Sequence, residues 1–280
     1  MYLSNFRTTR MVLVLLIGAT SQFCLDSRAV AEIIYSPDKC LIAIRGEITQ
    51  TTASEIETHL STNSSLCRQG RMFPLNTPAG DKDALTRQSI HVQLNSSGGD
   101  VEAAIRIGTA IRNVAGTTIV PADSACASAC VLIILGGIDR HVAGKVGLHR
   151  AYLMRLAGSP TDARKSYDAI NSGIANYLKT MNISERLLDV MNSVPPNDMR
   201  WLSIPKDEET LRELRISGTD PIYGDQRDSF MASKLGITKT EYYNRQRTAD
   251  VACNKANSTD SIKAAEAYIN CYRTIVHGDR

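Results

Sequence analysis

The chain has 280 residues, of which 43% are apolar, 22% are charged and 5% are aromatic. This composition is that of an ordinary globular protein, and it excludes the disordered, fibrous and multi-span membrane classes. The formal net charge of +3 is too small to indicate a protein that binds nucleic acid by neutralising its phosphates.

The N-terminal segment has the features of an export signal. Arg7 and Arg10 form a short basic start, an apolar run follows, and the sequence Ala-Val-Ala at 29–31 matches a signal-peptidase site. The apolar run is shorter than the roughly 20 residues that span a bilayer. We therefore expect residues 1–31 to be a signal peptide that is cleaved after Ala31, with an uncleaved anchor as the alternative. The mature protein is expected to be periplasmic or secreted.

The cysteines fit an exported protein. Removal of the signal peptide takes away Cys24 and leaves six of the seven cysteines. An even number is typical of a chain that forms disulfides in an oxidising compartment. Proximity in the sequence favours three pairs, which are Cys40–Cys67, Cys126–Cys130 and Cys253–Cys271.

Strand and helix patterns alternate along the first two thirds of the chain. Strands are predicted at 33–35, 41–44, 90–94, 117–120 and 146–148. Helices are predicted at 52–60, 101–111, 161–181 and 183–193. Residues 61–87 are predicted to be an exposed loop and residues 123–127 a turn, while the apolar segment 128–135 is too short to assign by periodicity. The alternation indicates an α/β layered fold built from βαβ units.

The last part of the chain has a different pattern. It is helical and polar, with helices expected at 229–234, 239–253 and 261–274. We therefore divide the mature chain into an α/β domain at 32–224 and a C-terminal helical extension at 225–280.

Two loop-to-helix junctions carry the candidate functional residues. Gly98 and Gly99 follow a predicted strand, and a glycine pair lets the backbone approach a ligand and turn its N–H groups outward. A plain tight turn is the alternative. Ser128 lies among small residues, and N–H groups at the start of a following helix would face an oxyanion formed beside its hydroxyl. An N-cap role is the alternative for this serine.

A serine nucleophile needs a base, and the chain has five histidines. His149 follows the predicted strand 146–148, at a sheet edge where loop residues gather. The other histidines are less suitable: His59 and His91 lie in polar or alternating patterns, His141 lies in a predicted turn, and His277 is expected in a fraying C-terminal tail. His149 is therefore the candidate base.

The order of these segments is more specific than any one of them. The chain has Asn-Ser-Ser-Gly-Gly-Asp-Val at 95–101, Ala-Ser-Ala at 127–129, Gly-Gly at 136–137, Arg140, and Gly-Leu-His at 147–149. In this order and spacing the chain resembles the Clp protease proteolytic subunit over residues 88–216. That family belongs to the Clp-protease/crotonase fold.

The resemblance implies a ββα spiral core with a helical handle, which would be the helices at 161–193. In the family this handle mediates assembly into rings, so a homo-oligomer is expected. The resemblance also implies peptide or unfolded protein substrates and no cofactor or metal. Because an exported protein has no supply of ATP, no ATPase partner is expected.

For the site, the resemblance implies a serine peptidase with Ser128 as nucleophile and His149 as general base. The backbone N–H groups of Gly98 or Gly99 and of Ala129 would form the oxyanion hole, in which the loss of one donor typically costs about 2.7–4 kcal/mol.

The chain departs from the family pattern at several positions. Ser97 stands where the family has proline, and Ser124 and Cys130 stand where it has glycines. Met199 occupies the position of the triad aspartate, and Asp198 is the neighbouring candidate for that role.

Four alternatives stay open. The chain could be an inactive Clp-like fold that binds peptides or scaffolds an assembly, or it could perform acyl-thioester chemistry of the crotonase kind. Lys145 could replace His149 as the base. Cys126 and Cys130 could supply a nucleophile or zinc ligands, although four residues on a helix span about 6 Å, which also suits a disulfide that rigidifies the Ser128 turn.

Overall fold

The computed structural model describes residues 31–63, 67, 90–152, 158–253 and 261–278. The expected signal peptide, except its last residue, and most of the expected loop at 61–87 lie outside the described residues. In the part of the chain that the structure describes, no helix is both long and apolar enough to cross a membrane.

The described residues form a nine-stranded mixed sheet with the strand order β8-β7-β5-β3-β4-β6-β9, and β2 and β1 extend it from β3. The strands are β1 (Glu32–Ser36), β2 (Leu41–Ile48), β3 (His91–Gly99), β4 (Thr117–Val120), β5 (Ala125–Ala127), β6 (Asp139–Val142), β7 (Lys145–Leu148), β8 (Arg200–Ser203) and β9 (Gly218–Thr219). The pairs β2–β3, β3–β4, β3–β5, β4–β6 and β5–β7 are parallel, whereas β1, β8 and β9 pair antiparallel with their neighbours.

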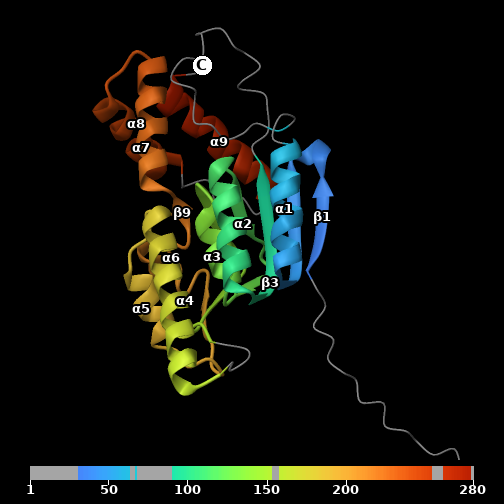
Figure 1. Cartoon of the computed structure of the whole chain (residues 1–280). Helices are drawn as coiled ribbons and strands as arrows, with labels where there is room; N and C mark the ends of the chain where they lie inside the picture. The colour runs from blue at the N-terminus through green and yellow to red at the C-terminus, as the bar shows by residue number, and fades with distance from the viewer. Residues whose placement is uncertain (1–30, 64–66, 68–89, 153–157, 254–260, 279–280) are drawn as a thin grey trace, which may run out of the picture.

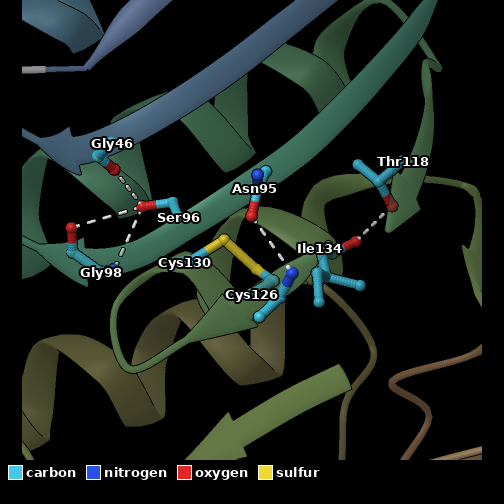
Figure 2. The surroundings of a disulfide bond; sticks show 9 residues. Gly46, Asn95, Ser96, Gly98, Thr118, Cys126, Cys130 and Ile134 are labelled. Atoms are coloured by element: carbon cyan, nitrogen blue, oxygen red, sulfur yellow. Dashed lines mark hydrogen bonds between the residues drawn. A yellow bond between two sulfur atoms is a disulfide. The ribbon is translucent and has the colours of Figure 1, made fainter. Parts of the chain in front are cut away.

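Strand β3 is shared by two parts of the sheet. Its first residues pair with β4, and its later residue Ser96 pairs with Cys126 of β5. The side-chain oxygen of Asn95 accepts a hydrogen bond of 3.2 Å from the N–H of Ala125 and so holds the start of β5 (Figure 2). Because β3, β5 and β7 run parallel, their C-terminal ends meet at one edge of the sheet, where ligands bind in open α/β folds.

Helices cover the sheet and extend from it at both ends. They are α1 (Gln50–Asn63), α2 (Val101–Asn113), α3 (Cys130–Gly136), α4 (Pro160–Thr180), α5 (Arg186–Asn192), α6 (Glu208–Glu213), α7 (Pro221–Lys234), α8 (Lys239–Cys253) and α9 (Ser261–His277), with a 3-10 turn at Pro37–Lys39. In Figure 1, α1 and α2 lie side by side over the sheet, α4 and α5 lie at one end of the molecule, and α7 and α8 lie at the other.

The core is centred on α3, whose seven residues are all buried. Gly136 of α3 meets α2 so closely that a Cβ there would lie 2.2 Å from the carbonyl oxygen of Gly108. Thr118 of β4 donates a hydrogen bond of 2.8 Å to the carbonyl oxygen of Ile134 and fixes the helix on the sheet (Figure 2). The segment that was too short to assign from the sequence is therefore a buried helix.

The C-terminal helices have a hydrophobic cluster of their own, formed by Ala232, Tyr242, Ala249, Cys253 and Val276. They are joined to the α/β part through Asp220, which precedes α7 and is fully buried. Its carboxylate forms an ion pair of 3.0 Å with Arg112 of α2 and accepts hydrogen bonds from the N–H groups of Ile222 and Tyr223. Helix α7 begins before residue 225 and crosses the boundary expected between the two parts.

The mixed α/β architecture and most longer elements agree with the sequence-based expectations, whereas several short strands do not. The prediction of a turn at 123–127 is wrong, because residues 125–127 form strand β5. His141 was expected in a turn and lies in β6. Strands β8 and β9 and helix α6 were not predicted. These elements have two to six residues, too few for a period to show, and the strands are defined by pairing with distant segments.

Candidate active site

Ser128 lies in the turn between β5 and α3, in a left-handed backbone conformation with φ of 56°. This conformation costs a residue other than glycine about 1–3 kcal/mol, and such strain is concentrated at functional sites. The N–H of Ser128 donates a hydrogen bond of 2.9 Å to the carbonyl oxygen of Gly147, and its own carbonyl accepts one of 3.0 Å from Val131. Ser128 is half-buried between the buried residues Ala127 and Ala129, so the turn presents a single serine at the end of β5.

The two glycines at the end of β3 meet different neighbours. A Cβ on Gly98 would lie 2.6 Å from Cβ of Ser128 and 3.1 Å from the nitrogen of Ala129. A Cβ on Gly99 would lie 2.2 Å from the carbonyl oxygen of Ile48. Both glycines have positive φ, at 105° and 141°. Gly98 therefore packs directly on the Ser128 turn, and Gly99 packs on β2.

The hydrogen bonds of this segment show where its amides point (Figure 2). The N–H of Gly98 donates to Oγ of Ser96 at 3.1 Å, and that hydroxyl donates to the carbonyl oxygen of Gly46 at 2.5 Å. The N–H of Asp100 donates to the carbonyl oxygen of Ile48 at 2.9 Å. The amides on both sides of Gly99 are thus engaged on the β2 side.

The amide of Ala129 differs from these. Ala129 is buried, with 1% exposure, yet no hydrogen bond among the described residues uses its N–H. A buried N–H without a partner is rare in folded proteins. This donor next to Ser128 is therefore available to an oxygen atom of a ligand.

His149 directly follows β7 and lies close to the Ser128 turn in the sheet. Strands β5 and β7 are parallel, with Ala127 paired with Gly147, so the residues that follow them leave the same edge of the sheet. His149 is 5% exposed, and its Nδ1 makes no hydrogen bond that meets ordinary geometry among the described residues. Burial lowers the pKa of the imidazole, and the backbone of Arg150 offsets part of this effect. Among the described residues, no hydrogen bond joins its ring to the Ser128 hydroxyl. The structure brings the two residues to one edge without a bond between them.

Among the described residues, no carboxylate forms a hydrogen bond with Nδ1 of His149. Strand β8 runs antiparallel to β7 with Leu148 paired with Arg200, and continuing this register places Met199 opposite His149. The Met199 sulfur would lie 2.7 Å from a Cβ on Gly147. Asp198 is exposed, and its Oδ1 accepts a hydrogen bond of 2.7 Å from the N–H of Met199. The structure therefore does not place the Asp198 carboxylate on the Nδ1 of His149.

The expected disulfide pairs are all present, as Cys40–Cys67, Cys126–Cys130 and Cys253–Cys271. Cys126 lies in β5 and Cys130 opens α3, so their bond spans a strand-turn-helix junction and not one turn of a helix. Both cysteines of this bond are fully buried. Their sulfurs are consumed by the bridge, which excludes them as nucleophile and as zinc ligands. Nowhere in the described residues do three His, Cys, Asp or Glu side chains form a group that could hold a metal ion.

The other candidate bases lie away from Ser128. Lys145 begins β7, where it pairs with Ala125 and is exposed, so it lies at the opposite end of that strand from His149. The ring of His59 stacks on Tyr35 at 4.9 Å, and His141 is exposed on β6. This arrangement favours His149 over Lys145 as the base.

Three residues near the site were not singled out from the sequence. Ser96 holds Gly98, and its position two residues before a glycine was the available signal. The ring of Tyr152 lies 5.7 Å from the ring of His149, and Trp201 contacts the Gly147 position. Both aromatic residues are exposed, at 44% and 48%, although large aromatic side chains are usually well buried.

No family model and no curated protein matches this sequence. Among solved structures, the chain is similar to a point mutant of ClpP1 from Listeria monocytogenes, with 20% sequence identity and a TM-score of 0.45. The similar region covers 62% of this chain and 88% of that chain.

Proposed function

We propose that the protein is an exported serine peptidase-like hydrolase in which Ser128 is the nucleophile and His149 is the general base. The observation that carries this proposal is the strained conformation of Ser128 at the sheet edge that it shares with His149, beside the buried Ala129, whose amide has no partner among the described residues. A reactive hydroxyl, an imidazole and an amide donor are the groups that acyl transfer requires.

In the proposed reaction, Oγ of Ser128 attacks a peptide carbonyl carbon, and an imidazole nitrogen of His149 takes the hydroxyl proton. The negative charge that develops on the carbonyl oxygen is bound by the N–H groups of Ala129 and Gly99. When the peptide C–N bond breaks, the imidazolium gives its proton to the leaving amine and an acyl ester remains on Ser128. A water molecule, deprotonated by His149, then attacks the ester carbon and releases the carboxylic acid and the Ser128 hydroxyl. Because the amides of Gly98 and Asp100 are engaged on the β2 side, we assign the second donor to Gly99 and not to Gly98.

The environment of His149 suits a base but limits its strength. A lowered pKa keeps the imidazole neutral, and therefore able to accept a proton, at neutral pH. Among the described residues, Nδ1 has no carboxylate partner to stabilise the imidazolium that forms in the reaction. The backbone of Arg150 favours the imidazolium, but burial has the larger effect and lowers the pKa. Loss of the carboxylate partner costs a serine protease about 10⁴-fold in rate. The missing bond to Ser128 does not oppose the proposal, because catalytic hydrogen bonds often tighten only when substrate is bound. We therefore propose a slow hydrolase.

The proposed substrates are peptides or unfolded proteins, since the proposed exported location offers no ATP-driven unfolding partner. Helix α4 buries only Ile174, Tyr177 and Leu178 among its described residues. Its first half is exposed, and we propose that the homo-oligomer forms through this surface. The proposed chemistry uses no cofactor and no metal.

The position of Met199 opposite His149 in the strand register favours a second function, which is binding without catalysis. A protein that has lost its triad acid could bind peptides or scaffold an assembly without cleaving them. Binding needs the surface around the site but not the Ser128 hydroxyl.

One experiment separates the two functions. Unfolded peptides are incubated with the wild type and with Ser128→Ala, and their cleavage is followed by mass spectrometry while their binding is measured by fluorescence anisotropy. The hydrolase proposal expects cleavage by the wild type, none by Ser128→Ala, and similar binding by both. Binding by both proteins without any cleavage would favour the scaffold.

A further inference from the structure

Ser128 adopts a left-handed backbone conformation in a segment that contains no glycine. The residues on both sides are Ala127 and Ala129, and Ser128 itself carries a side chain at a φ of 56°. Such a conformation persists only where the surrounding structure over-determines it. Something in this fold must therefore hold the turn.

The backbone hydrogen bonds at the turn attach it to β7 and to the start of α3. Ser128 donates to Gly147 across the sheet, and Val131 and Leu132 donate to the carbonyl oxygens of Ser128 and Ala129. The last two bonds belong to the start of α3, and the first holds the turn against β7. None of these three bonds joins the strand before Ser128 to the helix after it.

The Cys126–Cys130 disulfide makes that connection. It joins the central residue of β5 to the first residue of α3, with the two Cα atoms 5.3 Å apart, and it closes a five-residue ring with Ser128 at its centre. Both cysteines are fully buried beneath the turn. Figure 2 shows the bridge directly beside β3, the strand that carries Ser96 and Gly98.

We infer that Cys126 and Cys130 are positioning residues for the reaction, because their bond holds Ser128 in the left-handed conformation that presents its hydroxyl. This inference rests on the proposed function, since it concerns the same nucleophile. It assigns the bridge to the site and not chiefly to the stability of the whole fold. A bridge that closes so short a loop stabilises a protein less than one that closes a long loop, and the Cys253–Cys271 bridge spans 18 residues against 4 here.

The chain offers a matched control for this assignment. Cys253 and Cys271 also form a buried or half-buried disulfide, but they lie in the separate hydrophobic cluster of α7–α9. Their removal is expected to lower the unfolding temperature without changing the reactivity of Ser128. If the Cys126–Cys130 bridge had a purely structural role, removing either bridge would lower the reactivity of Ser128 only as far as it lowers the stability of the protein.

The test compares Cys126→Ala/Cys130→Ala with Cys253→Ala/Cys271→Ala. Each full chain is labelled with a fluorophosphonate probe well below its unfolding temperature, and its kcat and KM for a peptide are measured. We expect labelling and kcat to fall by about 10- to 100-fold in the first variant, the range for a displaced reacting group, with KM little changed. The second variant is expected to react like the wild type. Equal reactivity of the first variant and the wild type would overturn the inference.

Two further measurements keep the inference testable if the variant does not fold or the wild type does not react. Partial reduction of the wild type with a phosphine, with each bridge quantified by mass spectrometry, should show labelling lost in proportion to the opened Cys126–Cys130 bridge. A crystal structure of the variant should show a negative φ at Ser128. A wild type that is never labelled would contradict the proposed function alone, whereas a positive φ retained at Ser128 without the bridge would overturn this inference.

Discussion

The N–H of Ser128 donates a hydrogen bond of 2.9 Å to the carbonyl oxygen of Gly147, which lies two residues before His149. This bond continues the parallel pairing of β5 and β7 into the turn. The proposed nucleophile and base are thus attached to neighbouring strands of one rigid sheet, an arrangement that holds functional groups more accurately than loops do. Substrate binding then needs to adjust side chains and not the backbone.

The first prediction concerns the acid position. Met199→Asp is expected to raise kcat by about 10- to 100-fold, because a carboxylate opposite His149 would stabilise its imidazolium, an effect that reaches about 10⁴-fold in an optimised triad. Met199→Leu is the control and should leave kcat unchanged. Steady-state hydrolysis of a fluorogenic peptide measures both variants. If the aspartate variant is no faster than the leucine variant, Met199 does not occupy the acid position.

The second prediction concerns pH. The rate of acylation follows the neutral fraction of His149, and burial lowers the pKa of this imidazole below its ordinary value of 6.5. We expect the acid limb of kcat/KM to have its midpoint below pH 6.5, and the limb to move to higher pH in Met199→Asp because a nearby anion favours the imidazolium. A wild-type midpoint above 6.5 would contradict the buried, neutral base.

The lowered pKa of His149 also makes the free energy of unfolding depend on pH. Below pH 6.5 the unfolded chain binds a proton at His149 more readily than the folded chain, so the free energy of unfolding falls as the pH falls through this range. The pH profile must therefore be recorded only where circular dichroism shows a fully folded protein.

The third prediction concerns Ser96. Ser96→Ala leaves the N–H of Gly98 and the carbonyl oxygen of Gly46 without their partner, and each buried unsatisfied group costs about 1–3 kcal/mol. We expect a loss of unfolding free energy in urea and a decrease of about tenfold in kcat, because Gly98, which packs on the Ser128 turn and precedes the proposed oxyanion donor Gly99, loses its support. The exposed neighbour Ser97→Ala is the control. Unchanged kcat in Ser96→Ala would remove this serine from the site.

The longer elements could be predicted from the sequence because their periodicity extends over several turns. Helix α2 places Ala104, Ile107 and Ile111 on one buried face, and the expected helix at 101–111 matches it within two residues. Strands β5 and β6 could not be predicted, since three or four residues show no reliable alternation. They exist because parallel neighbours separated by many residues pair with them.

Part of the site could also be predicted. The cysteine spacing predicted the Cys126–Cys130 bridge, which the structure confirms. The roles of Ser128 and His149 were implied by the resemblance in segment order, and they stay predictions. The contact of Ser96 with Gly46 could not be foreseen, because it joins residues 50 positions apart. The orientation of the Asp198 carboxylate toward its own backbone also depends on the local conformation, which no spacing records.

The fourth prediction concerns the junction with the C-terminal helices. Asp220→Ala breaks a buried ion pair with Arg112 and removes the cap of α7, so we expect a loss of about 3–5 kcal/mol in the free energy of unfolding. Glu208→Ala removes the exposed pair with Arg212 and should cost only about 0–1 kcal/mol. Chemical denaturation of both variants measures the difference. Equal losses would show that the buried pair does not stabilise the junction.

The most direct test of the proposed hydrolase is the location of a covalent adduct. The native protein is treated with a fluorophosphonate, digested, and mapped by tandem mass spectrometry, with Ser128→Ala and His149→Ala treated in parallel. We expect the phosphonyl group on Ser128, no adduct on Ser128→Ala, and much slower labelling of His149→Ala. Labelling that is absent from the folded wild type at every pH, or that persists in Ser128→Ala, would contradict the proposal.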